Sequence, residues 1–333
     1  MALSKVNPNF VSQNLGRRNL IINGDMTVAQ RGTSYAYSNN ASGYHTLDRW
    51  YSANFSSGTL TLSQQTPTVG AVDSTNNLRA VTASTAGASA TVYSSQKIEN
   101  IKQFHNKSVT VSFMVKSSAA LTFQLRRQYN YGSGGSSEEY TAFTDVSVTT
   151  SWTKFTTTFS AVDYSSKTIG ANNYYGILFY WSTNQGTDQR NDATIEVTNV
   201  QLEVGDTDTD FEHRSYSEEL AACQRYYFRE NHTDTHMMSF IGYCASATLA
   251  IGVKFLPVSL RSSPTLTING NWHVLTGNTT QTVTGHSLSD STGTNLNAIQ
   301  IRANASSGLT TGDGLTMRDE GDATAWIAFA SEL

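Results

Sequence analysis

The sequence predicts an all-β protein made of a β-sandwich, a short helix and a second, smaller β domain. The first observation is a series of short segments, from Leu20 onward, in which apolar and polar residues alternate. The second is a composition with only 14% charged residues and 24 glycines, which is typical of half-buried strands joined by turns. The third is that helix-start signals precede only one periodic segment, after residue 215. A chain of 333 residues has room for both domains.

The first domain is predicted to span residues 19–213. Residues 1–18 are polar and show no sustained periodicity, so we interpret them as an extended arm rather than a domain. Beyond them, alternating segments mark the strands of the sandwich, and polar, glycine-containing stretches separate the strands. The predicted strands are 20–22, 57–64, 108–116, 121–125, 152–159, 174–180 and 193–202.

A hinge and a helix are predicted to separate the two domains. The last strand of the sandwich ends at Gly205, and an acidic loop follows at 206–210 (DTDTD). Ser215 then has the position of an N-cap, with Glu218 three residues later as its capping-box partner. We therefore predict a helix over 215–230 within a linker of residues 214–232. The second domain follows at 233–333, with strands predicted at 239–255, 266–268, 272–275, 298–303 and 325–330.

Composition and charge exclude several classes of protein. The net charge of −4 and the pI near 6.0 argue against a nucleic-acid-binding protein, which should show a basic face. No apolar run is long enough for membrane insertion. The first ten residues lack the apolar segment of a signal peptide, so export by the usual route is not expected. Cys223 and Cys244 are too few for a disulfide framework and are expected to be buried thiols, as fits synthesis in a reducing cytoplasm.

Four segments resemble a family of bacteriophage and prophage tail-fibre proteins, which are receptor-binding proteins. They are 19–26 (NLIINGDM), 29–32 (AQRG), 46–50 (TLDRW) and 201–227, with looser similarity to the end of the chain. The resemblance implies a first domain similar to a carbohydrate-binding jelly roll and a C-terminal β domain that trimerises. It also implies a location in the virion tail after synthesis in the host cytoplasm. Residues 1–18 have no clear counterpart, and we expect them to attach the fibre to another phage tail protein.

A strand with two polar faces is the first candidate for a glycan site. Within residues 125–131 (LRRQYNY), alternation places Arg127, Tyr129 and Tyr131 on one face, and positions 126, 128 and 130 on the other. Aromatic rings stack on pyranoses, and guanidinium or amide groups bridge sugar hydroxyls, so either face has sugar-binding chemistry. The resemblance places this segment on the sheet with the carbohydrate face. We predict a site on the first face; the alternative is a polar strand whose tyrosines pack on neighbouring residues.

A second aromatic strand completes the predicted site. Alternation over 174–181 places Tyr175, Ile177, Phe179 and Trp181 on one face. Core packing is the better interpretation for Ile177 and Phe179. Trp181, next to the polar loop 182–192, is the better candidate for contact with glycan. Trp50, inside the LDRW segment, is expected to be a buried anchor instead.

The resemblance also raises the question of a structural calcium ion, although no other cofactor is expected. Carbohydrate-binding jelly rolls often hold calcium where the first and last strands meet, and Asp25 and Glu203 are the candidate ligands there. The acidic run 206–210 lacks the glycine and the distal glutamate of an EF-hand, so a solvated hinge is the better interpretation. The seven histidines and two cysteines form no zinc pattern.

No catalytic constellation is visible, so we do not expect an enzyme. Glu138 and Glu139 adjoin and point in opposite directions, so they cannot flank one glycosidic bond. The loop YGSGGS at 131–136 lacks the lysine and helix of a phosphate-binding loop. The predicted function is reversible adhesion of a tail fibre to bacterial surface glycan or lipopolysaccharide. The alternatives are a structural adaptor or fibre shaft without sugar binding, and a glycan-cleaving tailspike.

The predicted helix carries an apolar stripe, which bears on oligomeric state. Leu220, Cys223, Tyr226 and Tyr227 share one side of the helix, and such a short helix is marginal without a partner. Together with the resemblance, this predicts a homotrimer. The alternative is that the stripe packs on its own chain.

Overall fold

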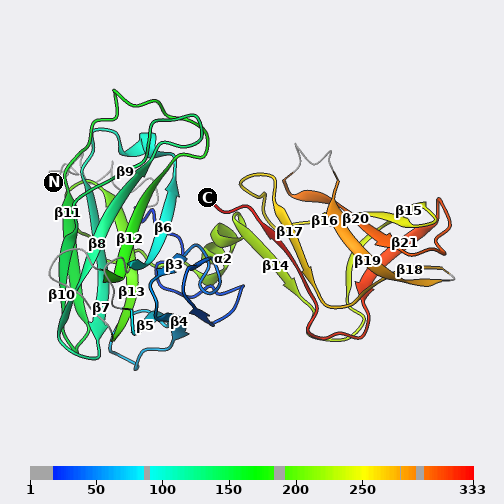
Figure 1. Cartoon of the computed structure of the whole chain (residues 1–333), viewed down its shortest axis with the longest axis horizontal. Helices are drawn as coiled ribbons and strands as arrows, with labels where there is room; N and C mark the ends of the chain where they lie inside the picture. Colours follow the sequence, from blue (N-terminus) through cyan, green and yellow to red (C-terminus); the bar gives the residue numbers. More distant parts are fainter. Residues whose placement is uncertain (1–17, 86–90, 184–191, 278, 290–295) are drawn as a thin grey trace, which may run out of the picture. The chain divides into compact units, whose positions relative to one another are not determined.

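The computed structural model describes residues 18–85, 91–183, 192–277, 279–289 and 296–333. The predicted arm therefore lies, except for Arg18, outside the described residues. The chain forms two compact units, one of residues 1–219 with Leu333 and one of residues 220–332 (Figure 1). Both units are built almost wholly from antiparallel strands, which confirms the predicted all-β class. None of the helices in the described ranges is long and apolar enough to cross a membrane.

The first unit is a jelly-roll sandwich of two sheets. One sheet has six strands in the order β1 (Ser34–Tyr37), β4 (Thr59–Gln65), β5 (Asn77–Ala83), β13 (Ala193–Val204), β7 (Val109–Ser117) and β11 (Thr153–Phe159). The other runs β10 (Thr144–Val148), β8 (Leu121–Asn130), β12 (Tyr174–Thr183), β6 (Thr91–Glu99), β3 (Tyr51–Phe55) and β2 (Ala41–Gly43), and β9 (Glu139–Tyr140) pairs with β8. A 3-10 helix, η1 (Ile101–Phe104), follows β6.

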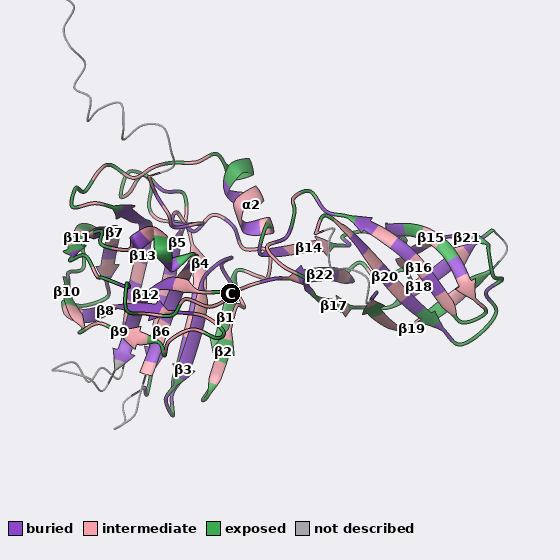
Figure 2. Ribbon diagram, turned by 90° about the horizontal axis from the view of Figure 1, so that it is seen from above, coloured by how far each residue is buried: buried purple, intermediate pink, exposed green. Residues whose placement is uncertain are grey.

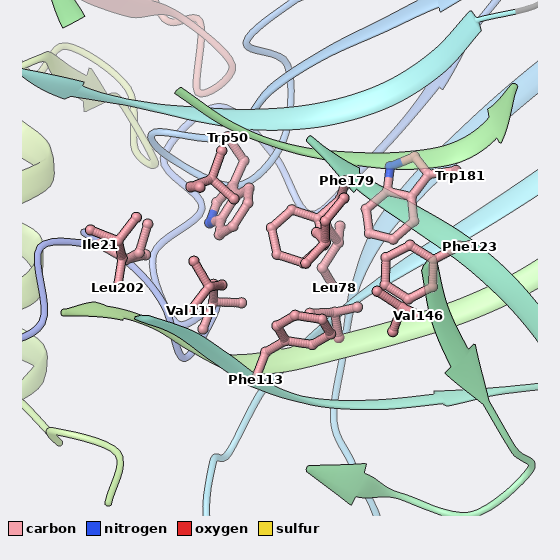
Figure 3. Close-up of a cluster of buried hydrophobic side chains, with 14 of the residues drawn as sticks. Ile21, Trp50, Leu78, Val111, Phe113, Phe123, Val146, Phe179, Trp181 and Leu202 are labelled. Carbon is pink, nitrogen blue, oxygen red and sulfur yellow. The ribbon is translucent and has the colours of Figure 1, made fainter. Parts of the chain in front are cut away.

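The core of the sandwich lies between these two sheets. Alternate residues of each strand point inward, so Val111 and Phe113 of β7 meet Phe123 of β8 and Phe179 of β12 (Figure 3). The rings of Phe113 and Phe179 are 5.1 Å apart and nearly perpendicular, an edge-to-face arrangement that aromatic pairs favour. The purple segments along the strands in Figure 2 follow the same alternation.

The N-terminal motifs build a buried polar network beside this core. Asn23, in a left-handed conformation, donates from its side chain to the carbonyls of Val28 (2.8 Å) and Asp48 (3.0 Å). Trp50 is 1% exposed, and its indole N–H donates to the carbonyl of Asn23 at 3.1 Å, as expected of a buried anchor. Arg49, also left-handed and buried, donates to the carbonyl of Lys97 at 2.7 Å. These motifs therefore fix the loops that cross one end of the sandwich.

The second unit combines a barrel with a small sheet. The barrel closes in the order β15 (Met238–Ser246), β16 (Leu249–Phe255), β20 (Ala298–Ala305), β19 (Thr280–Leu288), β18 (Trp272–Thr276) and β21 (Gly314–Asp319). The sheet has three strands, β14 (Tyr227–Asn231), β22 (Trp326–Ala330) and β17 (Thr265–Asn269). Both predicted thiols are buried and form no disulfide, with Cys244 inside the barrel.

The predicted helix was wrong in its second half. The helix α2 covers Tyr216–Gln224, and Ser215 and Glu218 form the expected capping box, with the Glu218 amide 3.3 Å from the Ser215 hydroxyl. Residues 226–228 (YYF) are strand formers, and Tyr227 opens β14, which pairs with β22. Cys223, Tyr226 and Tyr227 are at most 7% exposed within the single chain. Three of the four residues in the stripe proposed as a trimer contact are therefore already covered, and Leu220 is half-buried.

Strand prediction succeeded where alternation was long. Most predicted strands appear with shifted ends, but 20–22 is irregular, and Leu20 only donates one main-chain bond to Leu202 at 2.9 Å. The segment 239–255 is a hairpin of β15 and β16. The prediction missed several strands: β1, β2, β3, β5, β6, β9, β10, β14, β19 and β21. Of these, β6 lies at the centre of its sheet.

Candidate functional site

The structure places all four predicted glycan-binding residues in the core of the sandwich. Arg127 is 8% exposed, Tyr129 4%, Tyr131 0% and Trp181 1%. A ring enclosed in this way offers no face to a pyranose, so the prediction of a sugar platform at these residues was wrong. Figure 3 shows the Trp181 indole beside Phe179 and Phe123, with ring centroids 5.7 Å from each. Its N–H donates to the Ser94 hydroxyl at 2.8 Å.

The site prediction was wrong because it did not establish which face of each strand points into the core. Alternation along β8 puts Arg127 and Tyr129 on the same face as Phe123 and Leu125, which are buried core residues. Along β12, Trp181 likewise shares a face with Phe179, already expected to be core. Extending the alternation to the whole strand identifies the inner face. Within the short window 125–131, only Leu125 marks the inner face.

The buried polar groups on this inner face have structural partners. Arg127 donates to the carbonyl of Ser160 at 3.0 Å, and its guanidinium lies 4.5 Å from the ring centre of Phe159. The Tyr131 hydroxyl donates to Glu139 at 2.9 Å, and Lys167 pairs with the same carboxylate. Lys167 and Tyr131 lower the pKa of Glu139 by hydrogen bonding to it, so this carboxylate stays charged and anchored. These residues tie a loop to the sandwich.

The opposite face of the same sheet carries the candidate site. Its strands β12, β6 and β3 present tyrosines outward, and β9 adds one more beside β8. We call this group the tyrosine face, and it consists of Tyr51, Tyr93, Tyr140, Tyr174 and Tyr180. Tyr140 is 39% exposed, and Tyr51, Tyr93 and Tyr174 are half-buried. Tyr180 is only 6% exposed, because Phe143 packs edge-on against it at 5.0 Å, so it supports the others.

Between the tyrosines, a central strip follows Gly176 and Leu178 of β12. Strand register places Gly176 between Gln128 and Lys97, and the next outward residue, Leu178, between Arg126 and Ser95. Gly176 and Ser95 are the small residues of this strip, and Leu178 and Ser95 are each 2% exposed. Tyr93 lies 5.4 Å from Tyr180 and 6.3 Å from Tyr51 between ring centres, so the rings form a continuous row.

Polar groups stand in register with these rings. The Gln128 side-chain amide donates to Glu138 and to the Tyr140 hydroxyl, both at 2.9 Å. The Tyr140 hydroxyl donates to Glu138 at 3.1 Å, and the Asn130 amide donates to the same carboxylate at 3.2 Å. Planar amides, a carboxylate and a phenol therefore converge at one edge of the tyrosine face.

Two cations lie over the aromatic rings. The Arg126 guanidinium is 4.7 Å from the ring centres of both Tyr140 and Phe143, and it donates to the carbonyl of Thr141 at 2.7 Å. The Lys97 ammonium is 5.0 Å from the ring centres of Tyr51 and Tyr174. These cation–π contacts fix the orientation of the rings.

The tyrosine hydroxyls of this face are held in their neutral form. Burial raises the pKa of Tyr174 to about 12, with the Glu138 charge acting in the same direction. Burial likewise raises the pKa of Tyr93 and of Tyr140. At neutral pH each hydroxyl can therefore both donate and accept a hydrogen bond, as recognition of sugar hydroxyls requires.

Asp25 and Glu203, the predicted calcium ligands, each accept hydrogen bonds from nearby side chains. An Asp25 oxygen accepts the Thr27 hydroxyl at 3.0 Å. Glu203 accepts from the Thr209 hydroxyl at 2.6 Å and from the Gln201 amide at 2.9 Å, which anchors the acidic hinge. No group of three or more histidine, cysteine or acidic side chains is arranged for a metal within the described ranges.

The paired carboxylates at 138–139 diverge as predicted. Glu138 joins the tyrosine face through Gln128 and Tyr140, whereas Glu139 faces Tyr131 and Lys167. Because their partners lie on opposite sides of the sheet, the two groups cannot act as acid and nucleophile on one bond.

No family model and no curated protein sequence matches the chain. Among solved structures, a family 11 carbohydrate-binding module from Clostridium thermocellum, in complex with a β-1,3-1,4-mixed-linked tetrasaccharide, has 13% identity and a TM-score of 0.34. That match covers 53% of this chain and 98% of the module. A xylan-binding domain from Paenibacillus barcinonensis has 12% identity and a TM-score of 0.31, over 54% and 100%. The enzymatically active domain of bacteriophage CBA120 tailspike protein 4 has 11% identity and a TM-score of 0.34, over 56% and 21%.

Proposed function

We propose that this chain is a non-catalytic adhesin whose tyrosine face binds bacterial surface polysaccharide. One observation carries the proposal: four partly exposed tyrosines lie on one face of one sheet, with amide, carboxylate and cationic groups beside them. Such a surface offers stacking area for pyranose rings and fixed hydrogen-bonding groups for their hydroxyls.

The composition favours a sugar over other extended polymers. The net charge of −4 opposes binding to nucleic acid, and Arg126 and Lys97, which lie over rings, do not form a basic stripe. Tyrosine rings give a large contact area and lose little side-chain entropy on binding. Such a surface suits a protein that uses several weak sites together. Millimolar affinity at one site becomes tight attachment when several copies engage one surface.

The biological role that we propose is host recognition by a bacterial virus, with the chain as a tail fibre. The support is the resemblance of residues 19–26, 29–32 and 46–50, whose side chains form the buried network around Asn23 and Trp50. In this proposal residues 1–18 attach the fibre to the tail. The structural-shaft alternative needs the same scaffold and differs only in lacking the glycan.

We propose a homotrimer whose contacts come from the second unit. Strands β15 and β16 present an apolar patch on the outside of the barrel, with Ile241 66%, Tyr243 50% and Phe255 73% exposed, and with Ile251 and Val253 beside them in register. A surface cluster of this kind is unusual on a monomer and is typical of an interface. Ile241→Glu should shift light scattering from trimer to monomer mass. A wild-type monomer at micromolar concentration would contradict the proposal.

The glycan proposal is tested on a glycan array and by adsorption to bacterial cells. Replacing Tyr93 or Tyr174 by alanine should remove one stacking surface and weaken binding per site by about 1–2 kcal/mol. Tyr216→Ala is the matched control, because Tyr216 is 60% exposed at the start of α2, away from this sheet. A wild-type protein that binds no glycan would favour the structural shaft. Equal loss of binding in Tyr216→Ala would place the receptor site elsewhere.

A further inference from the structure

A separate recess lies on the outer surface of the other sheet of the sandwich. It has a volume of about 390 Å³, within the range of small-molecule sites. Its walls come from β7, from Lys154 on β11 and from segment 210–213, which follows the acidic hinge. Because the tyrosine face belongs to the seven-stranded sheet, the two surfaces do not share a strand.

A β-bulge supplies the central polar group of this pocket. The register of β13 against β7 shifts between Thr198 and Gln201, and Asn199 has a left-handed φ of 52° at the shift. Asn199 is 7% exposed and lines the pocket. Its Oδ1 accepts from Ser74, but its Nδ2 has no hydrogen-bond partner among the described residues. A nearly buried amide donor therefore remains available at the pocket.

Other pocket groups are uncommitted too. Ser112 is 3% exposed, and its hydroxyl has no hydrogen-bond partner in the described part of the chain. The carboxylates of Asp73 and Asp210 lack ion-pair partners there as well. Phe211 and His213, with rings 4.9 Å apart and perpendicular, add an aromatic wall. Buried donors, exposed acceptors and an aromatic ring thus surround one small volume.

Charge narrows the class of ligand. Lys154 is paired with Asp208 at 2.9 Å, so the neighbouring carboxylates of Asp73 and Asp210 leave the pocket with excess negative charge. An acidic sugar would be repelled, whereas hydroxyl or amino groups would donate to these carboxylates. The described residues also provide no cluster of three acidic or histidine ligands for a metal.

We propose that this pocket binds a single neutral or amine-bearing sugar residue. Its hydroxyls would accept from Asn199 and donate to Asp210, and the Phe211 ring would cover an apolar edge. The site does not depend on the tyrosine face. If both sites act, one sandwich can hold two strands or branches of a polymer, which raises avidity without a second protein.

Methionine methyl groups offer a local test on the full-length chain. Met114 lines the pocket, whereas Met26 and Met317 are buried in the cores of the two units. With ¹³C-methyl-methionine, titration with methyl α-D-glucopyranoside or D-glucosamine should shift the Met114 signal and leave those of Met26 and Met317 unchanged. D-glucuronate should not shift it. No shift with either of the first two sugars, or a stronger response to glucuronate, would overturn the proposal.

Variants then locate the binding. Asp210→Asn and Phe211→Ala should each weaken the Met114 response roughly tenfold, as expected for loss of a charged hydrogen bond or an aromatic contact. Asp206→Asn, in the same hinge but outside the pocket, is the control and should bind as wild type. Tyr93→Ala should leave the Met114 titration intact, so failure of the tyrosine face and failure of this pocket remain distinct. Unchanged titration in both pocket variants would overturn the assignment.

Discussion

Strand β8 carries similar residues on both faces, but one face lies between the two sheets and the other lies on the outside of the sandwich. Arg127 and Tyr129 point between the sheets and are at most 8% exposed, whereas Arg126 and Asn130 point outward and are half-buried. Gln128 shares the outer face but is also 8% exposed, and it bonds to Tyr140 there. On the inner face an arginine satisfies a carbonyl and packs on Phe159. On the outer face an arginine orients the rings of Tyr140 and Phe143.

The difference shows that residue type alone does not identify a binding surface in a β-sandwich. Tyrosine and arginine have large apolar bodies with polar tips, so both can be buried if the tip finds a partner. Ser160 and Glu139 provide such partners on the inner side. The same chemistry that makes these residues suitable for sugars therefore makes them suitable for a polar-lined core.

The largest effect that separates the faces should come from Trp181→Ala. The indole is enclosed by Phe123 and Phe179, so its loss leaves a cavity and should lower the free energy of unfolding by about 3–5 kcal/mol. Tyr174→Ala, on the outer face, should cost far less. Urea unfolding of the sandwich, followed by circular dichroism, measures both. Comparable losses in the two variants would contradict the assignment of the faces.

The sequence predicted the strands with long alternation and assigned the site to the wrong face, for a physical reason. Alternation is local, so 108–116 and 152–159 were recognised as β7 and β11 with ends within a residue or two. Which face is buried depends on the other sheet, and in the short polar window 125–131 only Leu125 records it. The only signal was the continuation of the pattern to Phe123 and Leu125. Asn199 in its bulge and the pocket beside it depend on long-range pairing, and nothing in the local pattern marks them.

Alkaline pH should unfold the sandwich because it ionises tyrosines on both faces of the sheet. Burial raises the pKa of Tyr131 and Tyr175 inside, and of Tyr93 and Tyr174 outside, above the ordinary value of 10.0. Because these pKa values are raised in the folded state, keeping the tyrosines neutral contributes to the free energy of unfolding. That contribution is complete below pH 10 and is lost as pH rises toward about 12, the pKa of Tyr174. Tyrosinate absorbance and loss of β-sheet circular dichroism should therefore rise in one transition. Ionisation of these tyrosines well before unfolding would show that they are solvated.

Removing one tyrosine hydroxyl from each face compares the two faces through smaller changes in stability. Tyr131→Phe removes the hydrogen bond to Glu139 inside the sandwich and should cost about 1 kcal/mol of unfolding free energy. Tyr140→Phe removes bonds to Glu138 and Gln128 at a position 39% exposed, so stability should change little while glycan binding weakens. Chemical denaturation and the glycan array together give both readouts. If Tyr140→Phe were the less stable variant and still bound glycan fully, the assignment of Tyr140 to the binding face would be contradicted.

The smallest effect on stability should come from Gly176→Ala, on the floor of the tyrosine face. An added Cβ would lie 3.1 Å from the Gln128 side chain, which must move slightly, and the backbone of Gly176 is not in a left-handed conformation. Alanine also reduces the freedom of the unfolded chain, so the unfolding free energy should stay within about 1 kcal/mol of wild type. The methyl group would nevertheless raise the strip between Tyr174 and Tyr93 and disturb the amide of Gln128, which weakens glycan binding several-fold. Because stability is nearly constant, a loss of binding here can be attributed to the surface itself. Unaltered binding would mean that the sugar does not lie over this strip.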